Sequence, residues 1–148
     1  MYGSQNRPIT LFSSAARAGV TTGTYGTAVD LCLAQKPIQA LCFCFDLTAS
    51  GTDNGDHLDV YVQTSLDLGV SWTDVVHFTQ IVGDVGAVKT YYAKVTAAGA
   101  ETMYEIGSAL SAAGVRNIIG NQIRGKYVVV DAGTANATFT FSLTANVL

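Results

Sequence analysis

Carboxylate and amide side chains crowd one turn-rich stretch of the sequence, and oxygen donors of this kind can bind a calcium ion. The stretch contains Asp53, Asn54, Asp56 and Asp59. Their spacing is not that of an EF-hand loop, and no glutamate follows at the distal position of such a loop. Aspartate and asparagine are also ordinary turn formers. Asp53, Asp56 and Asp59 are therefore weak calcium candidates beside the interpretation as a plain loop, and no other metal or cofactor is predicted.

Thiol and imidazole groups offer a second possible metal chemistry. Cys32, Cys42 and Cys44 are an odd set without a disulfide spacing pattern. A zinc site would have to combine the thiols of Cys42 and Cys44 with His57 and His77, but the two histidines lack ligand spacing. The sequence favours three reduced, buried cysteines that pack as small hydrophobic residues.

The sequence shows none of the usual catalytic motifs. No glycine-rich loop opens a helix for phosphate binding, and no nucleophile elbow is present. Most of the aspartates stand in turn-like stretches, where turn formation explains them. We therefore expect the protein not to be an enzyme.

A β-hairpin is predicted between residues 57 and 82. Its first half alternates apolar and polar residues, its second half is rich in β-branched and aromatic residues, and a short polar turn lies between. Asp67 can accept hydrogen bonds from nearby backbone N–H groups, and Gly69 can supply a positive φ. Trp72, the only tryptophan, can fold back over the turn and bury a large area.

The turn also resembles a known motif. Ser65, Asp67, Gly69 and Trp72, spaced Ser-x-Asp-x-Gly-x-x-Trp, resemble the Asp box, a hairpin motif common in sialidase-type propellers. A propeller repeats its motif over several blades, and this chain has one copy. The resemblance therefore implies a well-formed hairpin and not a sialidase activity.

Short β-prone runs separated by turn signals occupy most of the rest of the chain. They are residues 9–14, 26–34, 38–48, 87–95, 127–130 and 137–147. Residues 15–24 are predicted to be a loop, and residues 100–113 could form one short helix or a strand at 104–106. The pattern predicts an all-β, antiparallel sandwich of jelly-roll-like type, with about eight short strands and at most one short helix.

Two strands define the expected core. In residues 38–48, large apolar residues share one face, and Ala40, Cys42 and Cys44 share the other, which suggests a strand buried on both sides. A neighbouring subunit or a loop would cover the second face. In residues 137–147, phenylalanine and leucine alternate with threonine and serine, as expected of a half-buried strand.

Composition favours one domain that associates with other proteins. The chain has 148 residues, of which 49% are hydrophobic and only 13% are charged. A surface of small uncharged residues is poorly protected against association. We expect an extended N-terminal arm at residues 1–8 and a single sandwich domain at residues 9–148.

The charge distribution limits the classes of partner. The net charge is −3, and the eight lysines and arginines form no basic run. This weighs against nucleic acid and against an anionic membrane surface as partners. No secretory signal pattern and no run of membrane-spanning length are visible. We therefore expect synthesis in a cytosol.

Taken together, the segments resemble a family of small bacteriophage virion proteins, the β-sandwich head-decoration or cement proteins. Four stretches carry the resemblance. They are residues 9–17 (ITLFSSAAR), 41–52 (LCFCFDLTASGT), 58–81 (from LDVYVQTSLD to FTQI) and 122–146 (from QIR to FTFSLTAN).

The resemblance implies a virion structural protein that binds late to the outside of a phage head, after synthesis in the host cytoplasm. It implies the major capsid protein as partner and self-association as a homotrimer. We expect residues 1–20 and the loops 49–57 and 97–120 to make the contacts. Within these segments the candidate contact residues are Tyr2, Arg7, Arg17 and Arg116.

Two other functional classes stay open. A tail, neck or baseplate component would share the fold and the composition. A carbohydrate-binding module would use Trp72, Tyr91, Tyr92 or Tyr25 as a sugar platform. Because Tyr91 and Tyr92 are adjacent on a strand, they must point to opposite faces of the sheet.

Overall fold

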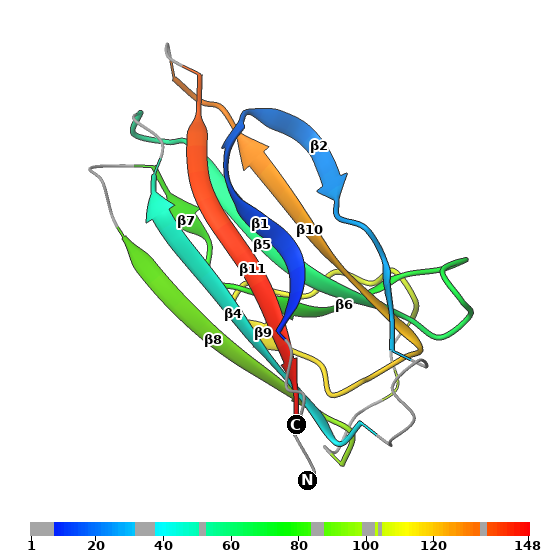
Figure 1. The fold of residues 1–148 in the computed structure, drawn as a ribbon. Helices are drawn as coiled ribbons and strands as arrows, with labels where there is room; N and C mark the ends of the chain where they lie inside the picture. The colour runs from blue at the N-terminus through cyan, green and yellow to red at the C-terminus, as the bar shows by residue number, and fades with distance from the viewer. Residues whose placement is uncertain are drawn as a thin grey trace, which may run out of the picture.

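Eleven β-strands make up the regular structure of the described residues in a computed structural model (Figure 1). The structure describes residues 8–31, 38–50, 53–83, 88–98, 103, 105–133 and 136–148, with the side chains of residues 20–22 excepted. The strands are β1 (Ile9–Ala18), β2 (Val20–Tyr25), β3 (Val29–Asp30), β4 (Ala40–Ala49), β5 (His57–Ser65), β6 (Thr73–His77), β7 (Ile81–Val82), β8 (Lys89–Thr96), β9 (Gly114–Val115), β10 (Gln122–Val130) and β11 (Thr138–Val147).

The strands form two sheets. Sheet A has the order β1-β11-β4-β8, and sheet B has the order β2-β10-β5-β6-β9, with β3 beside β10 and β7 beside β5. Every strand pair is antiparallel. The predicted all-β, antiparallel sandwich is thus confirmed. No helix occurs in the described part of the chain, which includes Met103 and residues 105–113 of the uncertain segment.

The chain crosses between the sheets near its start, where a loop was predicted. β1 extends through Ala18 and pairs with β11, and β2 follows after Gly19 and pairs with β10. The prediction of a loop at residues 15–24 was therefore wrong. Backbone pairing holds these small and polar residues in strands, although they lack an apolar pattern. Of the strand predicted at residues 26–34, only β3 is present in the described residues, and Cys32 lies outside them.

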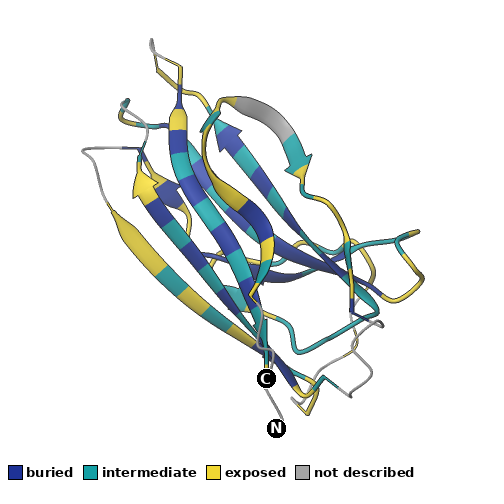
Figure 2. Cartoon of the chain, viewed as in Figure 1, coloured by how far each residue is buried: buried dark blue, intermediate teal, exposed yellow. Residues whose placement is uncertain are grey.

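The core lies between the inner faces of the two sheets. On β4, Leu41, Phe43, Phe45 and Leu47 are at most 1% exposed. Figure 2 shows the buried residues alternating with half-buried ones along β4, β10 and β11. Cys42 and Cys44 on the outward face of β4 are half-buried. No described part of the chain covers this face, so within one chain the two cysteines are less buried than predicted. Cover of this face by a neighbouring subunit stays a prediction.

Aromatic rings link the two sheets across the core. The ring of Phe12 on β1 meets Tyr127 of sheet B at 5.3 Å between centroids and Phe141 of sheet A at 6.0 Å. A Cβ atom at Gly125 would collide with the Phe12 ring, so β10 needs glycine at this position. Edge-to-face contacts of this kind stabilise a core beyond the area that they bury.

Candidate functional site

The outer face of sheet B carries a cation held between two aromatic rings. The guanidinium carbon of Arg124 lies 4.1 Å from the ring centroid of Tyr25 and 4.1 Å from that of Trp72. Its Nε donates to Gln63 Oε1 at 2.8 Å, and Gln63 Nε2 donates to Asp74 Oδ1 at 2.7 Å. Strands β2, β10, β5 and β6 each contribute to this cluster, because their outward positions are neighbours in the sheet register.

A second cluster on the same face is centred on His77. Its Nδ1 donates to the carbonyl oxygen of Leu110 at 2.7 Å, and its Nε2 lies 2.9 Å from Asp59 Oδ1. The ring stacks on Tyr61 at 4.0 Å between centroids, and Lys126 lies over the ring of Tyr61. Both ring nitrogens face oxygen acceptors, and only the imidazolium form donates to both at once.

The ionisation of this second cluster follows from its contacts. Burial alone would lower the pKa of His77, but the hydrogen bonds to Asp59 and to the Leu110 carbonyl raise it above its ordinary value. Burial would raise the pKa of Asp59, but hydrogen bonds from His77 and Gln80 hold it below its ordinary value. Burial, with the nearby charge of Asp59, raises the pKa of Tyr61 to about 12. The charged pair therefore ties the segment around Leu110 to sheet B.

The outer face of sheet A is built mostly of short side chains. Its outward residues on β11, β4 and β8 are Thr140, Ser142, Thr144, Asn146, Cys42, Cys44, Asp46, Thr48, Thr90, Tyr92, Lys94 and Thr96. Only Asp46 and Lys94 in this set carry a charge. The Thr90 hydroxyl donates to Asp46 Oδ1 at 2.7 Å. The face is polar and almost uncharged, and Tyr92, which is 76% exposed, is its one aromatic residue among these twelve.

The predicted hairpin turn is held by a dense set of hydrogen bonds. The Ser65 hydroxyl donates to Asp67 Oδ1 at 2.8 Å and accepts from the Gly69 N–H at 2.8 Å. Asp67 also accepts from the N–H and the hydroxyl of Ser71, and these bonds lower its pKa to about 2. Gly69 has a φ of 90°, which confirms the predicted positive φ. Trp72 Nε1 donates to the Gly69 carbonyl at 3.1 Å, so the indole folds back over the turn as expected.

Three apolar side chains project from this turn. Leu66, Leu68 and Val70 are 64%, 68% and 85% exposed. They form the apolar tip of the hairpin. The carboxylate of Asp67 is held by its hydrogen bonds to Ser65 and Ser71.

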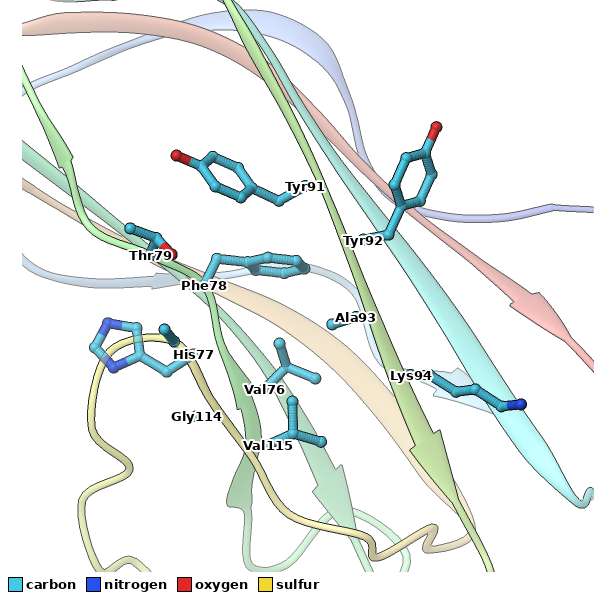
Figure 3. Close-up of a pocket in the computed structure, with 11 residues that line it drawn as sticks. Val76, His77, Phe78, Thr79, Tyr91, Tyr92, Ala93, Lys94, Gly114 and Val115 are labelled. Carbon is cyan, nitrogen blue, oxygen red and sulfur yellow. The ribbon is translucent and has the colours of Figure 1, made fainter.

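A groove of about 280 Å³ lies between the edges of the two sheets, on the open side of the sandwich. β8 forms one wall, and β6 with β9 forms the other (Figure 3). Val76, Phe78, Tyr91, Ala93 and Val115 give it an apolar lining, whereas the side chain of Lys94 projects on the far side of β8, away from the groove. Figure 3 shows Tyr91 on the groove side of β8 and Tyr92 on the other side, which confirms their predicted orientations.

The three calcium candidates do not form one site. Asp56 is fully buried, and its carboxylate accepts from the N–H groups of Ala132 at 3.0 Å and Asp53 at 3.3 Å. Asp59 projects from the outward face of β5 and bonds to His77 and Gln80. Among the described residues, no group of three or more histidine, cysteine, aspartate or glutamate side chains could hold a metal ion.

The zinc alternative fails for a topological reason. Cys42 and Cys44 lie on the outer face of sheet A, whereas His57 and His77 belong to sheet B. Because the two sheets pack face to face, the outward thiols point away from sheet B. The four side chains therefore cannot share one ion.

The two described arginines among the candidate contacts bond to the protein's own backbone. Arg17 donates to the carbonyl oxygens of Ser13, Ala15 and Phe141 at 2.7–2.8 Å. Arg116 donates to the carbonyl oxygens of Asp74, Ser108 and Ala109 and to the Ser108 hydroxyl.

Arg17 and Arg116 therefore stabilise the fold by linking backbone carbonyls of different segments. The other two candidate contacts, Tyr2 and Arg7, and the predicted arm at residues 1–8 except for Pro8, lie outside the described residues.

The aromatic residues considered for sugar binding are largely engaged. Tyr25 and Trp72 each present a face to Arg124. Tyr91 stacks on Phe45 at 5.9 Å between centroids. Tyr92 is the most exposed of the four at 76%, and Tyr25 is 52% exposed although Arg124 covers one face of its ring.

The sequence interpretation missed both clusters on sheet B. Polar residues at alternating positions of residues 57–65 and 122–130 signal an outward face. They do not say that Arg124 meets Tyr25 and Trp72, since these residues come from distant parts of the chain.

No family model matches this chain, and no curated protein matches it either. The described residues contain no helix with the length and apolar character needed to cross a membrane.

Proposed function

We propose that the protein is a non-enzymatic virion structural protein, a decoration protein that binds the outer surface of a phage head and stabilises contacts between major capsid protein subunits. The observation that carries this proposal is the outer face of sheet A. Twelve outward side chains on three adjacent strands form a polar surface with two charges. A protein that stabilises capsid subunits needs a rigid surface that packs closely against them.

The chemistry of this face suits a large protein contact. Charged residues are depleted at the buried centres of interfaces, because the desolvation of an ion is costly. Threonine, serine and asparagine side chains can exchange water for hydrogen bonds to a partner. Their short side chains also lose little rotamer freedom on burial.

The topology supports the same interpretation. We propose that the sandwich is a jelly roll, with the order β1-β11-β4-β8 in one sheet and β2-β10-β5-β6 in the other. Jelly rolls recur in viral capsid proteins and in lectins. Because one fold hosts many functions, this agreement supports the proposal without identifying the partner.

Under this proposal the protein works as a homotrimer at the capsid surface, and its partners are the major capsid protein and its own copies. The N-terminal arm, residues 1–8, extends the contact with the shell. Deletion of these residues is expected to lower capsid binding and to leave the sandwich folded. Unchanged binding by the truncated protein would remove the arm from the proposal.

The main test is a charge placed in the middle of the proposed contact face. Thr144→Arg puts a guanidinium on the outer face of sheet A, and Val128→Arg puts the same group at a half-buried outward position of sheet B. Each variant is mixed with undecorated shells of the phage that encodes the protein, and the bound protein is counted after sedimentation. Thr144→Arg is expected to weaken binding about tenfold or more, equivalent to about 1.4 kcal/mol, and Val128→Arg is expected to bind normally.

Two results would contradict the proposal. Equal binding by both variants would exclude sheet A as the contact face. If the wild-type protein binds no shell but is found in the tail or neck of purified virions, the alternative assignment to a tail, neck or baseplate component replaces the cement role.

A further inference from the structure

We propose that Asn54 is a site of self-modification, at which the backbone nitrogen of Gly55 attacks the side-chain amide of Asn54 and converts it to aspartate or isoaspartate without an enzyme. The two residues lie in the connection between β4 and β5. This inference goes beyond the proposed function and does not depend on it.

The sequence singles out this position. Asn54 is the only asparagine of the chain that is followed by glycine, whereas the others precede arginine, isoleucine, glutamine, alanine or valine. For the reaction, the side-chain carbonyl carbon of asparagine must approach the backbone nitrogen of the next residue. A Cβ atom on that next residue hinders the approach, and glycine has none. Asn54 is therefore expected to react faster than every other asparagine of the chain.

The fold requires the glycine that makes Asn54 reactive. Gly55 has a φ of 107°, which glycine adopts readily and other residues rarely. The Asp56 N–H donates to the Asp53 carbonyl oxygen at 3.2 Å and closes the turn around this glycine. A Cβ atom at position 55 would also lie only 3.3 Å from the Cβ atom of Ala132. The turn therefore excludes most of the residues that would slow the reaction.

The reacting groups are accessible in the folded protein. Asn54 is exposed, so water and buffer bases reach its side chain. Within the part of the chain that the structure describes, the Gly55 N–H has no hydrogen-bond partner. At Asn117, by contrast, the N–H of the next residue, Ile118, donates to the Arg116 carbonyl oxygen at 3.0 Å. The fold thus leaves the attacking nitrogen free at Asn54 and engages it at Asn117.

The reaction needs water as its only co-reactant. The Gly55 N–H loses its proton to a base, and the nitrogen forms a bond to the side-chain carbonyl carbon of Asn54. The bond from this carbon to the amide nitrogen breaks, and ammonia leaves with a proton from water, so that a cyclic succinimide remains. Water then opens the ring at the side-chain carbonyl, which gives aspartate, or at the main-chain carbonyl, which gives isoaspartate. No group is oxidised or reduced.

The products disturb a junction of three loops at Asp56. The buried carboxylate of Asp56 accepts from the N–H groups of Asp53 and Ala132, and its main-chain carbonyl accepts from the Gly83 N–H at 2.6 Å. Isoaspartate at position 54 adds a methylene to the main chain inside the turn that Asp53 and Asp56 close. A buried carboxylate that loses its hydrogen bonds is costly. We therefore expect the isoaspartyl form to be less stable than the unmodified protein.

The experiment is an incubation of the purified protein at neutral and at mildly alkaline pH, in water enriched in the heavy oxygen isotope. Peptide mapping by mass spectrometry locates the incorporated oxygen, and methylation by a protein isoaspartyl methyltransferase detects isoaspartate. Asn54 is expected to convert faster at the higher pH, since the attacking nitrogen must lose its proton. Asn117 and Asn136 are expected to convert more slowly by about tenfold or more, equivalent to about 1.4 kcal/mol in the barrier.

The matched control is Asn54→Gln, which keeps a side-chain amide before Gly55 but lengthens the side chain, so a larger and less easily formed ring would be needed. It is expected to stay unmodified at position 54. The same incubation of the urea-unfolded chain gives the rate without the fold. The inference is overturned if Asn54 of the folded protein stays intact while the unfolded chain converts, or if Asn117 or Asn136 converts as fast as Asn54.

A second measurement tests the effect on the junction at Asp56. Asn54→Asp carries the charge of the modified residue on an ordinary main chain, and ion exchange isolates the isoaspartyl form from aged wild-type protein. The urea midpoint is expected to fall slightly in Asn54→Asp and further in the isoaspartyl form. An isoaspartyl form with the midpoint of the unmodified protein would overturn the structural consequence.

Discussion

On the outer face of sheet B, charged and aromatic side chains bond to one another, whereas on the outer face of sheet A short hydroxyl and thiol side chains make few such contacts. Arg124 lies between two rings, and His77 donates to a carboxylate and a carbonyl. On sheet A, the bond from Thr90 to Asp46 joins two neighbouring strands. Both faces belong to the same sandwich and are equally close to the core.

This difference indicates different roles for the two faces. A network whose members already satisfy each other stabilises the monomer and would lose bonds if a partner displaced them. Short uncharged side chains add little to the stability of the monomer, and their burial in an interface costs little desolvation free energy and little rotamer entropy. The comparison therefore predicts that changes on sheet B alter stability, whereas changes on sheet A alter binding.

The largest effect is expected at His77. His77→Ala removes the bonds to Asp59 and to the Leu110 carbonyl and exposes the underside of Tyr61. Because hydrogen bonds to charged groups contribute more than neutral ones, a loss of about 2–3 kcal/mol in the free energy of unfolding is expected. Urea denaturation measures this loss. Thr144→Ala on sheet A is the control and should stay within about 0.5 kcal/mol of the wild type. Equal losses in the two variants would contradict the view that the outer face of sheet B stabilises the monomer more than that of sheet A.

A smaller effect is expected from pH. Because the pKa of His77 is raised in the folded protein, its contribution is complete below the ordinary value of 6.5 and is lost as the pH rises through the raised value. Because the pKa of Asp59 is lowered, its contribution is complete above the ordinary value of 3.8 and is lost as the pH falls through the lowered value.

Stability is therefore expected to decline between pH 5.5 and pH 8.5 by about 1–2 kcal/mol, the contribution of one charged hydrogen bond. Urea midpoints at the two pH values measure it. His77→Gln should show a flatter profile over the same range, and a variant as pH-dependent as the wild type would assign the decline to other groups.

The hairpin turn is expected to contribute about as much. Ser65→Ala removes the hydroxyl that bonds to Asp67 and to the Gly69 N–H, and Ser65 is 2% exposed. The expected loss is about 1–2 kcal/mol in the free energy of unfolding. Thermal unfolding followed by tryptophan fluorescence reports the change, because Trp72 covers the turn. Ser71→Ala, at an exposed bond to the same carboxylate, should cost less, and the reverse order would contradict this account.

The smallest effect concerns reactivity on sheet A. Burial and the neighbouring charge of Asp46 raise the pKa of Cys44, so its thiol is expected to react slowly with iodoacetamide at neutral pH. Asp46→Asn removes the charge and should increase the rate a few-fold without a change in stability. Peptide mapping by mass spectrometry separates Cys44 from Cys42. An unchanged rate at Cys44 would show that burial alone controls the thiol.

Much of the fold was predictable because strands have a local signature. Alternation with a period of two identified β4, β5 and β11 and the inward residues of each. It identified the first part of β1, at residues 9–14, and failed for residues 15–24, which are small and polar and are held in the edge strands β1 and β2 by backbone pairing. The predicted alternation of Ala40, Cys42 and Cys44 with the large apolar residues was correct; within one chain Ala40 is buried and the two cysteines are half-buried.

The interaction surfaces were less predictable. The turn at Ser65, Asp67 and Gly69 could be recognised because its bonds span at most four residues. The groove could not, since its walls come from β6, β8 and β9 and exist only when the two sheets have packed.

The sequence by itself determined most of the segments that extend, which residues of the alternating strands face the core, and where the hairpin turns, because these properties depend on neighbours within a few residues. Only the tertiary structure decided that Arg17 would bond to the carbonyl of Phe141, 124 residues away, and that His77 would bond to both Asp59 and Leu110. The outward side of a strand looks alike in every sheet. What covers it depends on pairings between distant segments, and those pairings form through backbone groups that all residues share.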